Sequence, residues 1–343
     1  MRRHGDIFIM HAPAARAGLT KRLPGRLAVL ALMAVAGVCF AQADVPDYPK
    51  RAVKLVVPYP PGGGADTLAR LVASGMAEKL GQPVVIDNKP GGNTAIASEY
   101  VANQPADGYT LLYVATAFVI NPSLYKLRYS TEKDFAPIAV IAEIPLIIVT
   151  NPQSSIYTVA DLIAEAKKRP GQLSYATYGT GSPVHLAAEL FQLMSATTLL
   201  HVPYKGSAPG LTDLMGGQVN LAFGSIEPSL QLIRNKKLRP IAVTTLSRIE
   251  AAPDVPTVSE SGLAGFEAIG WNGVVAPAAT PRPIVDKLNK IINQVVQEPE
   301  MLNKLKSQGV ELDIKTPREF SSMISSEIAK WDALVKKASV KVD

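Results

Sequence analysis

The chain is poor in cysteine and histidine. Its 343 residues include one cysteine, Cys39, and four histidines, of which only His185 and His201 lie beyond the first 43 residues. A single cysteine cannot close a disulfide within the chain, so the fold must rely on its hydrophobic core. Two separated histidines cannot supply the His/Cys cluster of a structural zinc site. We therefore expect neither a metal nor a cofactor.

A hydrophobic run long enough to span a membrane is also lacking. The apolar segment 27–40 follows six basic residues and precedes the small-residue sequence Ala41-Gln42-Ala43. This pattern predicts a secretory signal peptide, cleaved after Ala43, and an exported protein. Both Met1 and Met10 fit as the start of that segment. The bulky residue before Cys39 argues against lipidation at this cysteine.

An excess of charge of either sign is lacking once residues 1–43 are set aside. The formal net charge is +6, but residues 1–43 hold six Lys and Arg against one Asp. Residues 44–343 are therefore close to neutral, and their charge gives no reason to expect nucleic acid or a membrane surface as partner. They are numerous enough for two domains, each with its own core.

Nucleotide-binding loops are absent as well. The glycine-rich stretch 58–66 follows the apolar run Lys54–Val57 and precedes a helical pattern, so it predicts a strand, a turn and a helix start. Gly64 is followed by Ala65-Asp66, which lacks the Lys-Ser/Thr of a P-loop and the third glycine of a dinucleotide loop. A carboxylate or another small anion at the helix N-terminus fits this turn better than a nucleotide does.

Strand-like and helix-like segments alternate along the rest of the chain. Similar turns follow the predicted strands near residues 115, 178, 204 and 224. This alternation predicts an α/β protein with mostly parallel sheets, whose turns gather at the carboxyl ends of the strands. Two long apolar stretches, 138–150 and 266–276, are expected to cross between two domains. We then expect a ligand in a cleft between those domains.

A set of motifs in a fixed order gives a resemblance to a known family. The motifs are Tyr59-Pro60-Pro61-Gly62-Gly63 with Asp66, Asn88-Lys89-Pro90-Gly91, Asp107-Gly108-Tyr109-Thr110-Leu111, Gly179-x-Gly181-Ser182-x-x-His185-Leu186, Val202-Pro203-Tyr204-Lys205-Gly206 and Asp213-Leu214-Met215-Gly216-Gly217-Gln218-Val219. With Asn121-Pro122, Pro253-Asp254-Val255-Pro256-Thr257 and Trp271-x-Gly273, they run over essentially all of residues 48–343. The chain resembles the periplasmic solute receptors of tripartite tricarboxylate transporters, also called Bug receptors.

The resemblance implies a two-lobed periplasmic binding protein of the Venus-flytrap type, with two strands crossing between the lobes. The first lobe would comprise residues 44–144 and 269–343, and the second residues 145–268. The ligand would be a small mono- or dicarboxylate, or an amino or hydroxy acid. The receptor would serve uptake through a membrane permease of the tripartite tricarboxylate type, or sensing. It is expected to be a monomer without catalytic residues.

The resemblance also implies which loops hold the ligand. In the first lobe these residues are Tyr59, Pro61, Gly62, Gly63, Asp66, Ala115, Thr116 and Ala117. In the second lobe they are Thr180, Gly181, Ser182, His185, Tyr204, Lys205, Gly206, Gly224 and Ser225. The sequence departs from the family at Gly224, where many members carry an aspartate. The far end of the pocket is therefore expected to lack a carboxylate that could bind an ammonium group.

For Ser182, His185 and Lys205 the sequence leaves more than one role open. Ser182 and His185 could form the nucleophile and base of a secreted hydrolase, although no Gly-x-Ser-x-Gly elbow surrounds the serine. His185 could equally brace its loop or contact ligand, and Lys205 could pair with a second carboxylate or remain a solvated loop lysine. Asp66 is expected to cap the helix that follows the glycine turn, with its charge directed away from a ligand carboxylate.

Overall fold

The computed structural model describes residues 47–342. The predicted signal peptide, its cleavage after Ala43 and the question of Cys39 lie outside these residues. No helix in the described part of the chain is long and apolar enough to cross a membrane.

One mixed sheet runs through the described residues. Its nine strands are β1 (Val53–Val57), β2 (Val84–Asn88), β3 (Thr110–Ala115), β4 (Phe135–Thr150), β5 (Ser174–Thr177), β6 (Leu200–Pro203), β7 (Leu221–Ser225), β8 (Arg239–Val243) and β9 (Ile269–Pro277). Their order is β2-β1-β3-β9-β4-β7-β5-β6, and β8 pairs with β4. The expectation of mostly parallel sheets was wrong, because β4 and β9 run antiparallel to every strand that pairs with them.

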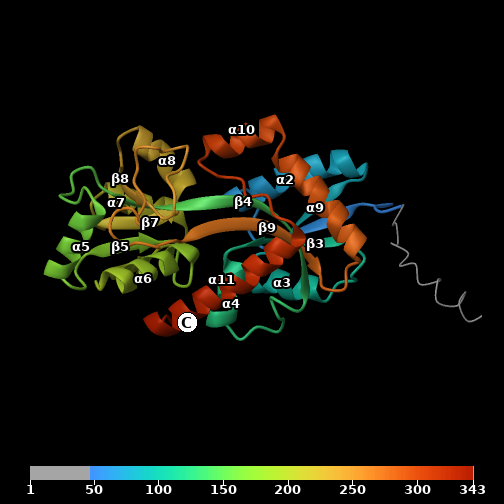
Figure 1. Cartoon of the computed structure of the whole chain (residues 1–343), viewed down its shortest axis with the longest axis horizontal. Helices are drawn as coiled ribbons and strands as arrows, with labels where there is room; N and C mark the ends of the chain where they lie inside the picture. Colours follow the sequence, from blue (N-terminus) through green and yellow to red (C-terminus); the bar gives the residue numbers. More distant parts are fainter. Residues whose placement is uncertain (1–46, 343) are drawn as a thin grey trace, which may run out of the picture. The chain divides into compact units, whose positions relative to one another are not determined.

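Helices connect most of the strands, and the last three form the C-terminal part of the chain. They are α2 (Gly64–Leu80), α3 (Ala95–Ala102), α4 (Ala117–Leu124), α5 (Val159–Lys168), α6 (Pro183–Ser195), α7 (Ser207–Met215), α8 (Ile226–Arg234), α9 (Arg282–Val296), α10 (Pro299–Ser307) and α11 (Pro317–Ala338). A short 3-10 turn, η1 (Gly92–Thr94), precedes α3. Figure 1 shows α2, α8, α9 and α10 on one side of the sheet and α3, α4, α6 and α11 on the other.

Strand β4 joins the two halves of the sheet. Its first part pairs with β9, from Phe135 opposite Pro277 to Pro145 opposite Ile269. Its second part pairs with β7 and β8. Sixteen residues are unusually long for one strand, and the register shifts twice along its pairing with β9. The segments expected to cross between domains are thus adjacent strands that extend from one half of the sheet towards the other.

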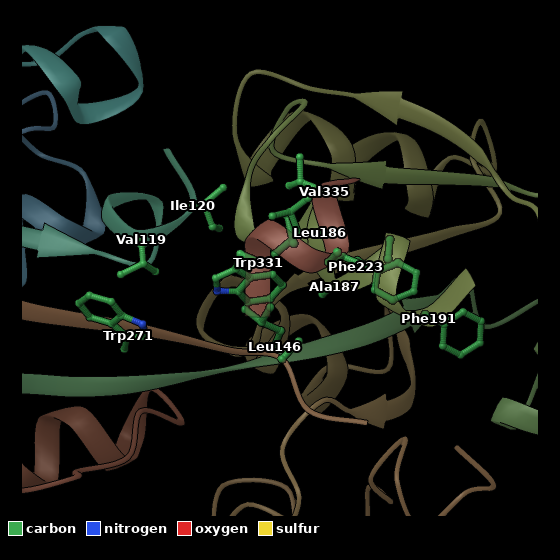
Figure 2. Close-up of a cluster of buried hydrophobic side chains, with 14 of the residues drawn as sticks. Val119, Ile120, Leu146, Leu186, Ala187, Phe191, Phe223, Trp271, Trp331 and Val335 are labelled. Atoms are coloured by element: carbon green, nitrogen blue, oxygen red, sulfur yellow. The ribbon is translucent and has the colours of Figure 1, made fainter. Parts of the chain in front are cut away.

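Helix α11 covers both halves of the sheet on one side. Its Trp331 is 1% exposed and belongs to a buried cluster with residues of α4, β4 and α6. Figure 2 shows Trp331 and Val335 beside Leu186 and Ala187 of α6. The Trp331 Nε1 donates to Glu327 Oε2 at 2.7 Å, so its one polar atom is satisfied. The C-terminal helix therefore packs against α4, β4 and α6.

Candidate ligand-binding site

The carboxyl ends of the strands in the two halves point towards each other. Ala115, the last residue of β3, lies opposite Asn272 of β9, which lies opposite Ala142 of β4. Ser225, the last residue of β7, lies opposite Leu146 of the same strand β4. Four residues of extended chain separate the two positions along β4, which is about 13 Å. The loops that leave β3 and β7 therefore face each other across this short interval.

Helices begin immediately after these strand ends. α2 follows β1, α4 follows β3, and α6, α7 and α8 follow β5, β6 and β7. β1 and β3 are parallel and form one group, and β5, β6 and β7 are parallel and form the other. The five helix N-termini therefore lie at the carboxyl ends of these two groups of strands, which face each other. Each N-terminus carries unpaired N–H groups and a partial positive charge. The interval between the two groups of loops is therefore suited to an anion.

The first loop is braced by Asp66, which does not cap α2 as expected. The helix begins two residues earlier, at Gly64 with Gly63 as N-cap, so Asp66 is its third residue. Its Oδ2 accepts from Gly62 N and from Arg70 Nε, both at 2.9 Å, and its Oδ1 accepts from Asn88 Nδ2 at 2.8 Å. These bonds to Arg70 and Gly62 lower the Asp66 pKa to about 2. Asp66, 2% exposed, fixes the glycine loop from beneath.

The backbone at position 62 adopts a conformation that only glycine takes up easily. Its φ is +86°, a region that residues with a Cβ rarely adopt. No atom lies within 4 Å of the position that a Cβ would take on Gly62 or Gly64. Pro61, Gly62 and Gly63 are exposed, so their backbone is open to a ligand.

The loop after β3 is tied to the neighbouring strand. Thr116 N donates to Trp271 O at 3.2 Å, and Trp271 N donates to Thr116 Oγ1 at 2.9 Å. The Thr116 hydroxyl is thus occupied by backbone contacts and is 2% exposed. Ala115 is partly buried and Ala117 is buried. This loop can offer N–H groups at the start of α4 rather than a free hydroxyl.

Three hydrogen bonds argue against the hydrolase interpretation. Ser182 caps α6, because its Oγ accepts from His185 N at 3.3 Å while donating to Gly179 O at 2.6 Å. The Nδ1 of His185 accepts from Gly181 N at 3.2 Å. No hydrogen bond within residues 47–342 joins the serine hydroxyl to the imidazole ring, which a nucleophile and its general base require. These contacts instead hold the loop in shape.

A stacked pair of histidines lies beneath the same loop. The rings of His185 and His201 are 4.1 Å apart, and His201 Nε2 lies 2.6 Å from Thr177 Oγ1. Burial, and for His185 also the neighbouring His201, lowers the pKa of each histidine to about 4. Both rings are therefore neutral at pH 7. His185 is 5% exposed, so it supports the loop from inside.

The remaining loops of the second half surround a small pocket. Residues 176–178, 206, 207, 210, 211 and 222–224 line it, so Gly206 and Gly224 contribute and Ser225 lies next to it. The Tyr178 hydroxyl accepts from Ser225 N at 2.6 Å and would lie 3.1 Å from a Cβ on Gly224. Glycine at 224 therefore leaves room for Tyr178. The Tyr204 hydroxyl is engaged by Asp213 at 2.7 Å, and Thr180 and Lys205 are exposed.

Tyr113, Tyr178 and Glu227 were not among the residues expected from the sequence, whereas Tyr59 was. Burial raises the pKa of Tyr59 to about 12, and Tyr113 has a fully buried hydroxyl with no partner among the described residues. The charges of Tyr59 and Glu227 add to the burial that raises the pKa of Tyr113, and Glu227 also acts on Tyr178. Tyr113 stands near the end of β3 and Glu227 just after the end of β7, the two strand ends that face each other. Tyr113 and Glu227 stand in no motif, so only the strand order brings them together.

Comparison with known proteins places this arrangement in a family. The model of the tripartite tricarboxylate transporter family receptor, TctC, matches residues 68–340. The chain belongs to this family. As a TctC receptor it is 35% identical over 323 residues to the protein BugT of Bordetella pertussis, covering 91% of this chain and 98% of BugT. The family consists of periplasmic solute receptors, as the motifs indicated.

Two solved structures with bound ligands are similar to this TctC receptor. The Rhodopseudomonas palustris protein Rpa4515 with adipate is 38% identical, with a TM-score of 0.77 over 86% of this chain and 99% of the other. MatC from Rhodopseudomonas palustris with bound malate is 30% identical, with a TM-score of 0.72 over 84% and 100% of the two chains. The two-lobed periplasmic binding fold expected from the sequence is thereby confirmed.

Proposed function

We propose that this receptor binds one small carboxylate between the facing loops of the two halves. The observation that carries the proposal is the convergence of five helix N-termini at the strand ends around one short interval. Related receptors with adipate and malate support the same ligand class. The residues expected from the sequence are retained as the proposed site, some as ligand contacts and some as supports, with Tyr113, Tyr178 and Glu227 added.

The roles within this set differ. The exposed backbone at Pro61, Gly62 and Gly63 and the start of α4 would hold the anchoring carboxylate. Asp66, Thr116, Ser182 and His185 would act as supports, since their polar atoms are already engaged by the protein. The loops containing Thr180, Tyr204 to Gly206, and Gly224 with Ser225 would contact the far end of the ligand.

The division into lobes follows from the same strand order. Residues 44–144 and 269–343 would form one lobe and residues 145–268 the other, with β4 and β9 between them. Helix α11, which packs on both α4 and α6, would restrain their relative movement. Closure of the lobes would bring the two groups of loops onto the ligand.

The cellular role is transport or sensing rather than catalysis. Residues 1–43 would direct export and be removed, leaving a monomer in the periplasm. A membrane permease of the tripartite tricarboxylate type would take the ligand from the closed receptor. Among residues 47–342 no group of three or more His, Cys, Asp or Glu side chains is arranged to hold a metal ion.

A paired assay separates the receptor from the hydrolase. A thermal-shift panel of mono- and dicarboxylates, hydroxy acids and amino acids is run beside a panel of carboxylic esters. We expect stabilisation by at least one acid and no ester turnover. Ester hydrolysis that is lost in the Ser182→Ala variant would contradict the proposal and favour the enzyme.

A further inference from the structure

Glu227 occupies a position that none of the expected contacts includes. It is the second residue of α8, directly after the end of β7. Side chains of a helix lean towards its N-terminus, and here that direction leads beyond the end of β7 towards the loops after β1 and β3. The core-facing residues of α8 are Ile226, Ser229 and Leu230, so Glu227 is not held in the core of its own half.

The carboxyl group of Glu227 has no partner among the residues that the structure describes. It is partly buried, yet no hydrogen bond or ion pair of its side chain is found among residues 47–342. A partly buried carboxylate without a donor or a cation is costly, because its desolvation is not repaid by the protein. Burial accordingly raises its pKa.

A second polar group nearby is also unpartnered. The Tyr113 hydroxyl, on a side chain with 0% exposure, lacks a hydrogen bond within the described residues. Tyr113 stands two residues before the end of β3 and Glu227 two residues after the end of β7, and these strand ends face each other along β4. The charge of Glu227 also contributes to the raised pKa of Tyr113 and of Tyr178. Buried polar groups in native proteins are nearly always satisfied, so the unpartnered Tyr113 hydroxyl, with the partly buried Glu227 carboxylate at the facing strand end, indicates a missing polar ligand.

We propose that Glu227 is a specificity-determining residue whose carboxylate accepts a hydrogen bond from an ammonium group of the ligand. This inference rests on the proposed function, in which a carboxylate of the same ligand is anchored by the first-half loops. It replaces the expectation that glycine at 224 leaves the far end of the pocket without an acidic group. The ligand class is then an amino acid rather than a simple dicarboxylate.

The negative charge of Glu227 favours an amino acid over a dicarboxylate as the ligand. A second ligand carboxylate beside it would place two like charges in a partly desolvated site, which raises the free energy. An ammonium group there supplies both a donor and the missing positive charge. Lys205, the one basic side chain in the second-half loops, is exposed and forms no ion pair among the described residues, so it does not neutralise Glu227 in place of the ligand.

The test compares ligands of equal length that differ at one end. Titration calorimetry is run on the ligand-free receptor with butyrate, succinate and gamma-aminobutyrate, then with caproate, adipate and epsilon-aminocaproate, and with glutamate and leucine. We expect at least one amino acid to bind at least tenfold more tightly than caproate, adipate, butyrate and succinate, a difference of about 1.4 kcal/mol. This ranking needs no variant and is independent of any folding defect.

Glu227→Gln then assigns the preference to one residue. This variant should lose the amino-acid preference at least tenfold while binding dicarboxylates as well as or better than before. Glu267→Gln is the matched control, because Glu267 is also partly exposed, lines a pocket with Lys315, and belongs to none of the proposed ligand loops. The control removes the same charge and should leave the ranking unchanged.

The outcomes separate the two proposals. A wild-type receptor that prefers dicarboxylates, or a Glu227→Gln variant with the wild-type ranking, overturns the role of Glu227 and leaves the carboxylate receptor standing. An equal effect of Glu267→Gln also overturns it, because the cause would then be net charge alone. A receptor that binds no acid of the panel overturns both.

Discussion

His185 and His201 stack with their ring planes inclined by only 22°, although sixteen residues separate them in sequence. The pair joins the start of α6 to strand β6. One ring accepts from Gly181 N, and the other lies beside the Thr177 hydroxyl at the end of β5. The shape of the loop between β5 and α6 therefore depends on two neutral imidazoles.

Acid should weaken both the fold and the ligand affinity through this pair. The pKa of each histidine falls from 6.5 to about 4 in the folded protein, so below pH 6.5 the unfolded chain binds more protons than the folded one. Stability from these residues is complete above pH 6.5 and is lost as the pH falls towards 4. We expect the melting temperature to drop less on acidification in a His185→Phe, His201→Phe double variant. Equal drops in the two proteins would contradict this role.

Glu143 should give stability the opposite pH dependence to that of the two histidines. Burial, then the neighbouring Asp313, raises the pKa of this crossing-strand carboxyl from 4.5 to about 7, although Lys315 lowers it. The folded protein therefore holds a proton that the unfolded chain releases between pH 4.5 and 7, and stability from Glu143 falls as the pH rises through that range. Glu143→Gln should raise the melting temperature more at about pH 8 than at about pH 5. A uniform change at both would show that burial of the charge is not the cause.

Replacing Asp66 should affect stability and binding together. Asparagine offers one acceptor oxygen where the carboxylate accepts from Gly62, Arg70 and Asn88. Loss of a charge-assisted hydrogen bond costs about 1.5–3 kcal/mol, and the loosened glycine loop should bind carboxylates more weakly. Asp161→Asn, in the exposed capping box of α5, is the control and should not alter affinity. Normal affinity in a destabilised Asp66→Asn protein would show that the glycine loop takes no part in ligand binding.

Trp331 should be a large contributor to stability. Its side chain is 1% exposed and packs where α11 meets α6. Trp331→Ala should lower the free energy of unfolding by about 3–5 kcal/mol, as large-to-small changes in cores do. Leu246→Ala, at a side chain that is 56% exposed, should change it by less than about 0.5 kcal/mol. Chemical denaturation measures both, and a small loss for Trp331→Ala would mean that α11 is not firmly docked.

Much of the fold could be predicted because local signals were strong. The apolar run Lys54–Val57 and the glycine-rich stretch 58–66 predicted a strand, a turn and a helix start, and the structure shows β1 followed by α2 there. The mixed character of the sheet was missed, because pairing direction depends on strands far apart in sequence. Helix α4 was also missed, since Pro122 within it and the lack of a capping side chain at Thr116 gave no helix signal.

The site was predicted as loops, while the roles of individual side chains depended on tertiary contacts. Asp66 looked like a helix cap because aspartate is favoured there, but the helix begins at a glycine and leaves the carboxylate free to brace Gly62. Tyr113 reads as an ordinary strand residue and Glu227 as a surface helix residue. Only the opposing directions of β3 and β7 along β4 place them near each other.

Binding of a small carboxylate is tested most directly by following thermal unfolding of the ligand-stripped receptor as the acid is added. Adipate, malate and the amino acids of the panel are each titrated, with the free acids compared against their neutral amides. The account predicts saturable stabilisation by at least one acid, about 2.7 kcal/mol at roughly one hundred times its Kd, and none by the matching amide. Stabilisation by no acid, or by acid and amide alike, would contradict it.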